Sequence, residues 1–470
     1  MQEYYQFVLF FTFLFSIFGL MQWYILHNYF RWLQVITSEQ SYPRFRMAGI
    51  IFFAVANFVF LLRFPSTDMG WYQQPLFQNL IIYPGGIFYG AVVFTFIILL
   101  IVRTSYRLVT LIDKISTRAP FSHIRSGFRL VFTRPAKPEN FTDSGDLFES
   151  QLAPDPESTS DSSQTEQPEL KKAAKWMDEQ PETPISSQIS RRQFLRTAGT
   201  AVIATPVLFT IGASTATSHD YRIVHRKLHY PGLPTSLNGL KIVQISDIHS
   251  GIYMTETQMQ DIFELANEQH PDLVTITGDF VDNSISEIPA LCRSITRLKS
   301  EYGIYGCLGN HDHYASASAV TSALRQRSIQ LLTNDHQTLT INGERLTLIG
   351  VDDAGAGNRN FARLDQALYN MANDSFQILL SHRPDMFDQA RKHGIDLTLA
   401  GHTHGGQIGF DFMGIPVYPI HLFQKYAKGL YEHGDHKLYV NVGIGMVGVP
   451  VRLVRPELTV IELTNSISVV

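Results

Sequence analysis

The chain has 470 residues, of which 45% are hydrophobic, and its mean hydropathy of -0.01 indicates that part of it lies in a membrane. The formal net charge of -4 provides no basic field, which argues against nucleic acid as a partner. Its two cysteines are too few for a disulfide framework or a thiolate zinc site, and we expect them to be core residues.

Three apolar stretches come first in the chain, each near the length that a bilayer requires. They run from Phe7 to Leu26, from Met47 to Leu62 and from Gly86 to Val102. We interpret residues 1–108 as a three-helix transmembrane region, although the second stretch is short enough for a buried core helix. The stretches carry almost no ionisable residue, so anchoring is a simpler role for them than transport.

Basic residues are unevenly distributed over the segments that flank these helices. The first loop carries Arg31, Arg44 and Arg46, the second carries only Arg63, and the segment after Val102 is again rich in arginine and lysine. The positive-inside rule then places the N-terminus outside and residues 109–189 in the cytoplasm. Within this basic segment, Pro, Ser, Glu and Gln dominate from about Pro135 to Gln188, which predicts a disordered linker.

Residues 190–216 form a separate unit with a basic start and an apolar middle. Ser190 to Arg196 read Ser-Arg-Arg-Gln-Phe-Leu-Arg, and a moderately apolar run follows from Thr197 to Ala213. This order resembles a twin-arginine export signal within the chain, although a fourth membrane helix with a basic flank would look similar. Both alternatives carry residues 217–470 out of the cytoplasm, whereas a buried helix would leave them inside. We therefore expect a multi-pass protein of the bacterial cytoplasmic membrane with an extracytoplasmic C-terminal domain, and the twin-arginine export machinery as a partner.

The C-terminal half alternates short apolar runs with helix-like polar stretches, which predicts an α/β domain. The six runs are Leu240 to Ile245, Leu273 to Thr277, Ile304 to Leu308, Leu346 to Val351, Phe376 to Leu380 and Ile395 to Leu399. Five of them end in a cluster of metal-ligand residue types. These clusters are Asp247-Ile248-His249, Gly278-Asp279-Phe280-Val281-Asp282, Gly309-Asn310-His311-Asp312, Ser381-His382 and Gly401-His402-Thr403-His404. Each alone is as typical of a turn as of a site, but five at successive strand ends predict one ligand crevice.

The order and spacing of these clusters resemble the calcineurin-like metallophosphoesterase family over about Leu240 to Leu463. The similarity is greatest to its bacterial membrane-associated or exported branch, whose ends resemble the segment from Tyr439 to Gly445. The resemblance implies a four-layer αββα sandwich with two metal ions at one edge of the sheets. It also implies that one ion is held by Asp247, His249, Asp279 and His404, and the other by Asp279, Asn310, His382 and His402.

The chemistry of such a site explains these residue types. Two cations about 3.5–4 Å apart repel each other, and the Asp279 carboxylate, with an oxygen for each ion, would offset that repulsion. Imidazole and carboxylate ligands favour divalent transition metals, with manganese preferred here and iron or zinc as alternatives. A water shared by the ions becomes hydroxide near neutral pH and attacks phosphorus in line. His311 directly follows Asn310 and is the expected general acid, or else a hydrogen-bonding neighbour of the ligands.

Other residues receive weaker interpretations. We expect Asp312 to orient a neighbouring imidazole and His313 to be structural or exposed to solvent. Arg452 and Arg455 would either reach a substrate phosphate or form surface ion pairs. The aromatic-rich stretch from Tyr418 to Tyr431 fits a core cluster better than a substrate wall.

The sequence thus predicts a metal-dependent hydrolase of a phosphodiester or of a lipid-linked or sugar-nucleotide pyrophosphate at the outer face of the membrane. A phosphomonoesterase is the alternative activity, and a non-catalytic scaffold or sensor on the same fold is the alternative class. The complete set of seven ligands argues against the scaffold. We expect a phosphorylated small-molecule or lipid-linked substrate.

Overall fold

The computed structural model describes residues 2–62, 71, 74–115, 191–215, 220–355, 360–372, 374–412, 415–448 and 450–466. The linker predicted from Pro135 to Gln188 lies outside these residues.

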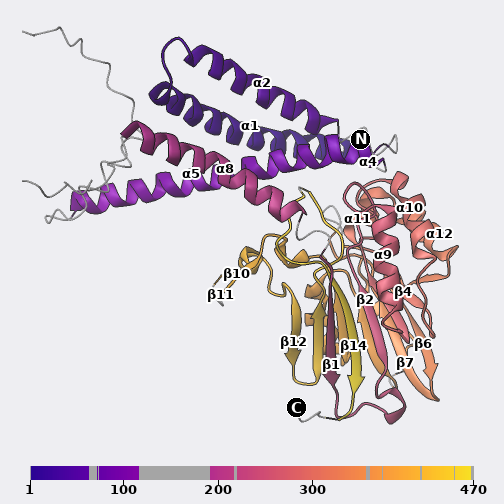
Figure 1. Cartoon of the computed structure of the whole chain (residues 1–470). Helices are drawn as coiled ribbons and strands as arrows, with labels where there is room; N and C mark the ends of the chain where they lie inside the picture. The colour runs from indigo at the N-terminus through magenta and orange to yellow at the C-terminus, as the bar shows by residue number, and fades with distance from the viewer. Residues whose placement is uncertain are drawn as a thin grey trace, which may run out of the picture. The chain divides into compact units, whose positions relative to one another are not determined.

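Long helices contain all four apolar stretches of the N-terminal half (Figure 1). They are α1 (Gln2–Ile36), α2 (Tyr42–Leu61), α5 (Tyr83–Ile115) and α8 (Arg191–Thr215), and the short α4 (Pro75–Phe77) and η2 (Gln78–Ile82) precede α5. Among the described residues, three segments are long and apolar enough to cross a membrane: Tyr42–Leu61, Gln78–Leu111 and Arg196–Ser214. Length and composition therefore support association with a membrane.

A polar trio joins α1, α2 and α5 within their apolar stretches. Asn57 Oδ1 accepts hydrogen bonds from Gln22 Nε2 at 3.1 Å and from the Tyr89 hydroxyl at 2.6 Å, and Asn57 Nδ2 donates to Gln22 Oε1 at 2.8 Å. Hydrogen bonds between helices add to packing where no water competes. The trio therefore links three helices, and Arg103 Nη1 adds a hydrogen bond of 3.3 Å from α5 to the Tyr24 hydroxyl of α1.

Two six-stranded sheets form the C-terminal domain (Figure 1). The first has the order β1-β14-β2-β3-β4-β5 and the second the order β12-β13-β9-β8-β7-β6. The strands of the first sheet are β1 (Arg222–His229), β2 (Lys241–Ile245), β3 (Leu273–Thr277), β4 (Ile304–Cys307), β5 (Ile329–Leu331) and β14 (Glu457–Thr464). Those of the second are β6 (Asp335–Ile341), β7 (Glu344–Gly350), β8 (Phe376–Leu380), β9 (Leu397–Ala400), β12 (Gly429–His433) and β13 (His436–Val440). Strands β2 to β5 run parallel to one another, as do β7, β8, β9 and β13.

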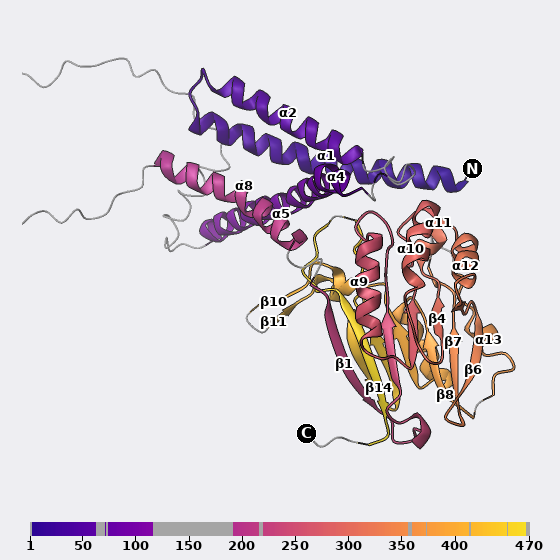
Figure 2. The same ribbon diagram turned by 45° about the vertical axis from the view of Figure 1, so that its right-hand side comes forward.

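Apolar side chains fill the space between the two sheets and cover both outer faces. The layer between the sheets contains residues of both, including Ile242, Leu273, Leu348 and Ile378. Helices α9 (Glu256–Asn267), α10 (Ile288–Ile295) and α12 (Ala317–Arg325) pack on the first sheet (Figure 2). The short α13 (Leu364–Ala367) and α14 (Phe387–Ala390) pack on the second sheet. The domain is therefore the four-layer αββα sandwich that the resemblance implies.

Burial on two faces explains why the predicted strands are continuous apolar runs. In β2, Ile242 packs between the sheets, whereas its neighbour Val243 packs against the outer helices, and both are fully buried. Parallel strands in such a position have no solvent-facing side and lose the polar alternation. All six predicted strands are present, with ends shifted by at most two residues.

One further pair of strands belongs to neither sheet. Strands β10 (Phe410–Phe412) and β11 (Ile415–Val417) pair only with each other, in an antiparallel hairpin. In both ribbon views this hairpin extends away from the sandwich (Figures 1 and 2). It follows the loop that carries His402 and His404.

Candidate metal centre

The predicted site residues lie in loops at the carboxyl ends of five parallel strands. Strands β2, β3 and β4 of the first sheet are each followed by such a loop, as are β8 and β9 of the second sheet. Both sheets therefore contribute to one centre. Six of the seven predicted ligands are buried, and His402 is half-buried. They are, in chain order, Asp247, His249, Asp279, Asn310, His382, His402 and His404.

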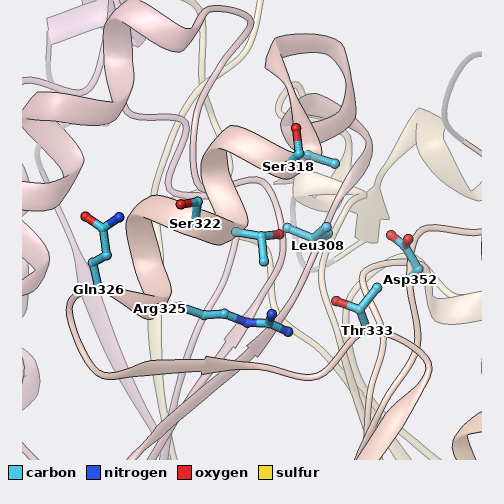
Figure 3. A pocket seen from close by; sticks show the side chains of 9 residues that line it. Leu308, Ser318, Ser322, Arg325, Gln326, Thr333 and Asp352 are labelled. Carbon is cyan, nitrogen blue, oxygen red and sulfur yellow. The ribbon is translucent and has the colours of Figure 1, made fainter.

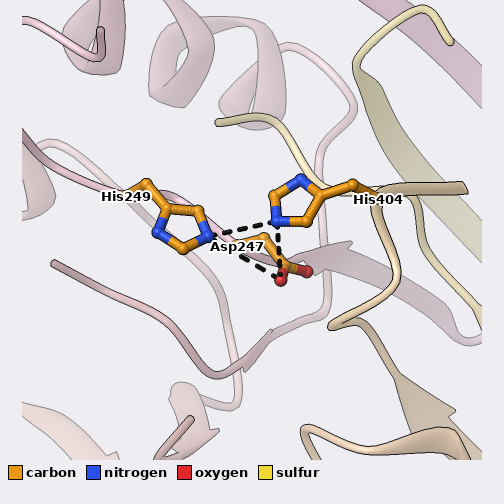
Figure 4. A group of neighbouring side chains, drawn as sticks. All are labelled: Asp247, His249 and His404. Atoms are coloured by element: carbon orange, nitrogen blue, oxygen red, sulfur yellow. Dashed lines mark hydrogen bonds and ion pairs between the residues drawn. The ribbon is translucent and has the colours of Figure 1, made fainter. Parts of the chain in front are cut away.

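The first group of converging side chains consists of Asp247, His249 and His404 (Figure 4). The two Nε2 atoms of His249 and His404 lie 3.2 Å apart, and His404 Nε2 lies 3.4 Å from Asp247 Oδ1. Donor atoms bound to one ion at about 2.0–2.2 Å lie about 2.8–3.6 Å from each other at tetrahedral or octahedral angles. These two distances fit a single ion, and His249 Nε2 lies 4.0 Å from Asp247 Oδ1, which requires a wider angle between those two ligands.

The second group consists of Asp279, Asn310, His382 and His402. His382 Nε2 lies 3.2 Å from Asp279 Oδ2, 3.1 Å from Asn310 Oδ1 and 3.1 Å from His402 Nδ1. His382 Nδ1 lies 3.0 Å from the carbonyl oxygen of Thr277, a contact that fits an N–H at Nδ1 and leaves Nε2 free to act as a ligand. The three distances from His382 Nε2 are therefore within the range expected for donors that share one ion.

Asp279 belongs to both groups through one oxygen. Its Oδ2 lies 3.2 Å from His382 Nε2 and 3.5 Å from His249 Nε2. Its Oδ1 accepts a hydrogen bond from the backbone N–H of His311 at 2.8 Å. In this structure Oδ2 faces both groups while Oδ1 contacts the amide, whereas the expectation was one carboxylate oxygen for each ion.

The backbone at the site adopts a conformation that side chains rarely favour. Eleven non-glycine residues of the described chain have positive φ, and five of them are predicted ligands. These five are Asp247 (φ 50°), His249 (48°), Asp279 (53°), His402 (73°) and His404 (49°). Such conformations persist where the surrounding structure imposes them, and they concentrate at functional sites. The concentration here is independent support for a functional centre.

Glycines allow the loops of the centre to approach one another closely. A Cβ atom on Gly309 would lie 2.2 Å from Asp279 Oδ1, and one on Gly443, which has a φ of 76°, would lie 2.7 Å from the Cβ of Asp247. Both glycines belong to segments that the family resemblance singled out. A side chain at either position would displace a predicted ligand.

Asp282 is a site residue for which the sequence predicted no role. Its Oδ1 lies 3.4 Å from His311 Nδ1 and 3.6 Å from His249 Nδ1, and its backbone oxygen also contacts His311 Nδ1. Burial opposes the protonation of His311, but the carboxylates of Asp279 and Asp282 raise the pKa of His311 to about 9. Asp282 thus orients His311 with Nε2 directed away from it. In the sequence, Asp282 is the second aspartate of the motif Gly-Asp-x-x-Asp, and this position could have identified it as a site residue.

Asp312 connects two loops of the centre through hydrogen bonds and does not contact an imidazole. Its carboxylate accepts hydrogen bonds from the backbone N–H groups of Gly309, Phe280 and Val281, at 2.9, 2.9 and 3.2 Å. The expectation that Asp312 orients an imidazole is therefore wrong. Its role is to hold the loop after β3 against the loop after β4.

The predicted strand that ends in none of the five clusters, β7, is followed by two acidic residues, Asp352 and Asp353, which support the site from outside. Asp352 Oδ1 lies 2.7 Å from His313 Nε2, so His313 is structural. Asp353 Oδ1 accepts a hydrogen bond from Arg383 Nε at 2.9 Å, and Arg383 Nη1 lies 2.9 Å from His402 Nε2. The guanidinium group of Arg383, which was not a predicted site residue, is therefore held beside a predicted ligand.

Arg452 and Arg455 do not reach the centre. Arg452 is fully buried and donates to the backbone oxygens of Val442, Gly443, Gly445 and Val454. Arg455 is exposed and pairs with Asp220 at 2.6 Å. A phosphate contact is therefore excluded for Arg452 by its burial, and Arg455 forms the surface ion pair that was the alternative.

An open pocket lies beside the centre without including it (Figure 3). Helix α12 lines it with Ser318, Ser322 and Arg325, and Asp352 lies on its other side. None of the predicted ligands lines this pocket. The candidate centre is therefore identified by the side chains that converge at the sheet edges, and not by this pocket.

The composition of the centre suits divalent cations. Its donors are imidazole, carboxylate and one amide oxygen, all buried or nearly so. Burial opposes the protonation of His382, but the carboxylates of Asp279 and Asp247 raise the pKa of His382 to about 10. The buried carboxylates therefore favour a positive charge at the centre. The side chains present therefore fit a metal site of the transition-metal type.

Comparisons with known proteins agree with this geometry. Residues 240–406 match the calcineurin-like phosphoesterase family. The chain is 32% identical over 287 residues to the metallophosphoesterase YkuE of Bacillus subtilis, covering 59% of this chain and 99% of YkuE. The chain therefore belongs to the calcineurin-like metallophosphoesterase family.

Other relatives are matched over a smaller part of their length. The chain is 32% identical to a transmembrane protein with metallophosphoesterase domain of Danio rerio, covering 57% of this chain and 62% of that protein. It is 34% identical to a metallophosphoesterase of Helicobacter pylori (strain 26695), covering 46% of this chain and 58% of that protein. The family thus includes bacterial and animal relatives of this chain.

Proposed function

We propose that the chain is a dinuclear metal-dependent hydrolase of phosphoester or phosphoanhydride bonds. The observation that carries this proposal is the position of Asp279 Oδ2, within 3.5 Å of an imidazole nitrogen of each ligand group. One oxygen between two sets of donors suits two ions held close together. Asp247, His249 and His404 would complete one ion's ligands, and Asn310, His382 and His402 those of the other.

The residues around the ions would position the substrate and transfer a proton. Two bound divalent cations would polarise the phosphoryl group and acidify a water molecule. His311 would protonate the departing oxygen from Nε2, because Asp282 holds its Nδ1. Arg383 would contact a phosphoryl oxygen, since Asp353 fixes its guanidinium group beside His402 and a planar cation suits that anion.

The metal that we favour is manganese, with iron or zinc as alternatives. Imidazoles and carboxylates dominate the donor set, and no cysteine lies among these donors. Such donors are less suited to magnesium or calcium, which prefer oxygen alone.

We place the reaction at the outer face of a bacterial cytoplasmic membrane. The candidate spans support a membrane location, and the loop charges and Arg191-Arg192 support export, with the twin-arginine machinery as a transient partner. At this location, a phosphodiester or a lipid-linked or sugar-nucleotide pyrophosphate would be the substrate.

Purified full-length protein with added manganese tests this proposal. A diester, a monoester and a nucleotide-lipid pyrophosphate would be compared at equal concentration, with and without chelator. We expect hydrolysis of the diester or the pyrophosphate to exceed that of the monoester, and chelator to abolish it. Preference for the monoester would contradict the substrate class, and activity that survives complete removal of metal would contradict the mechanism.

A further inference from the structure

Two adjacent apolar side chains project into solvent near the candidate metal centre. Leu422 and Phe423 are each 81% exposed, and no other large hydrophobic side chain in the described part of the chain is as exposed. Leu422 ends the 3₁₀-helix η8 (Pro419–Leu422) and Phe423 follows it, within the stretch for which a core cluster was expected. That expectation is met by Tyr426, which is buried against Phe387, and is wrong for Leu422 and Phe423.

The exposed pair lies at the end of a larger apolar segment. The preceding hairpin of β10 and β11 has the sequence Phe-Asp-Phe-Met-Gly-Ile-Pro-Val, and it pairs with neither sheet. An isolated two-stranded hairpin is marginally stable in water. We call the described residues 418–423, which contain the exposed pair, the apolar finger.

Contacts at its base fix the apolar finger to the loop of the candidate centre. Thr403 Oγ1 donates to the carbonyl oxygen of Ala427 at 2.5 Å. A Cβ atom on Gly406 would lie 2.8 Å from that of Ile420, so these segments are in close contact. Thr403 lies between His402 and His404 in the chain. The finger is therefore held directly against the loop that carries two predicted ligands.

Basic and aromatic side chains surround the base of the finger. Residues 418–431 contain two lysines and no acidic residue. Lys428 Nζ lies 3.4 Å from the centre of the Tyr418 ring, and Lys425 Nζ lies 4.6 Å from that of Tyr426. Apolar side chains beside aromatic and basic ones are the composition of segments that lie in a membrane interface.

We propose that the apolar finger inserts into the interfacial region of the bilayer that the helices of this chain occupy. A lipid surface is favoured over another protein because Arg196–Ser214, a candidate span, ends six positions before Asp220, where the described domain begins. Such a short connection keeps the domain at the membrane surface. Lys425 is paired with Asp388 at 2.7 Å, so Lys428 is the lysine beside the finger that an anionic lipid headgroup would meet.

The test measures the depth of single spin labels in the full-length chain, one chain per nanodisc of phosphatidylcholine and phosphatidylglycerol. The native Cys292 and Cys307 are buried and would be replaced by alanine. A cysteine at position 422 or 423 then carries the label. The matched control is position 369, because Tyr369 is 74% exposed on the same domain.

We expect labels at 422 and 423 to collide more with oxygen and less with an aqueous nickel complex than the label at 369. Leu422→Glu, with the label kept at 423, should restore access of the nickel complex. Equal aqueous access at 369, 422 and 423 would overturn the proposal. Protection that appears only in nanodiscs holding two chains would also overturn it, because the finger would then contact a second copy. Neither measurement depends on catalytic activity.

Discussion

Asp282 links a predicted metal ligand to the predicted general acid, because its carboxylate lies near Nδ1 of both His249 and His311. Replacement by asparagine removes a charge that raises the pKa of His311. A general acid must be protonated, so activity falls as pH rises through its pKa. Asp282→Asn should therefore move the alkaline limb of the pH profile of kcat/KM to lower pH, by about 1–3 units.

The control for this prediction is Asp352→Asn, since Asp352 pairs with His313 outside the ligand groups. This variant should leave the alkaline limb in place. Metal content would be determined on the same samples. An unchanged limb in Asp282→Asn at full metal content would show that Asp282 does not act on the catalytic proton.

His311 lies beside both ligand groups but belongs to neither, which separates its effect on catalysis from that on metal binding. As the general acid it should contribute about 10²–10⁴-fold to the rate for a poor leaving group. His311→Ala should therefore keep its metal and turn over slowly, and its deficit should shrink with a nitrophenolate leaving group, which needs little protonation. The measurement is the ratio of kcat/KM, wild type over variant, for both kinds of substrate.

His313→Ala is the matched control for His311→Ala. His313 stacks on Phe361 and pairs with Asp352, away from the predicted ligands. Its replacement should change kcat/KM equally for both leaving groups. An equal loss on both substrates in His311→Ala, or a loss of metal, would contradict the general-acid role.

At the scale of elements, Arg452 organises the loop from Asn441 to Met446. The loop contacts the backbone at Asp247, because the backbone N–H of Gly445 donates to the backbone carbonyl oxygen of Asp247 at 2.7 Å. Arg452→Met would leave buried backbone carbonyls without a donor, so the free energy of unfolding should fall by about 2–5 kcal/mol. Denaturant unfolding in chelator measures this loss without a contribution from metal.

Arg455→Met offers the comparison for Arg452→Met, because the chemical change is the same and only burial differs. Arg455 forms an exposed ion pair with Asp220, and such pairs contribute about 0–1 kcal/mol. A stability loss of similar size in both variants would mean that the buried guanidinium has no special role in the loop.

The strands that the sequence predicted share one physical property. Each lies in the interior of a sheet and is buried on both faces, so it appears as a continuous apolar run. Strand β1, Arg222–His229, was not predicted because it lies at a sheet edge and carries polar side chains on its exposed face. Its pairing with β14, at the opposite end of the domain sequence, depends on long-range contacts that no local pattern reveals.

The candidate site also differs between what local sequence patterns predict and what depends on long-range contacts. The types of the seven predicted ligands follow from short motifs at strand ends, and the structure brings them together. The supporting contacts of Asp312 and Arg383 depend on how two separate loops fold against each other. Local sequence therefore predicts which groups meet, and tertiary structure determines what orients them.

At the scale of the whole molecule, the positive-inside rule and the paired arginines predict the same topology. A reporter fused at Gln151 should lie in the cytoplasm, and one fused after Val470 should lie outside. The charge-conserving double substitution Arg191→Lys and Arg192→Lys should retain the second reporter in the cytoplasm if a receptor reads the arginines. Both wild-type reporters on one side would contradict the topology. Export of the double variant would favour a basic flank before a membrane helix.

The most direct test of the central claim is the metal content of the purified full-length protein. Elemental analysis after purification with manganese should find about two transition-metal ions per chain. His404→Ala, which removes a donor of one group only, should retain about one ion, and Asp279→Ala, which removes the shared oxygen, should weaken the binding of both. A reproducible content of one ion or none in catalytically active protein would contradict a dinuclear centre.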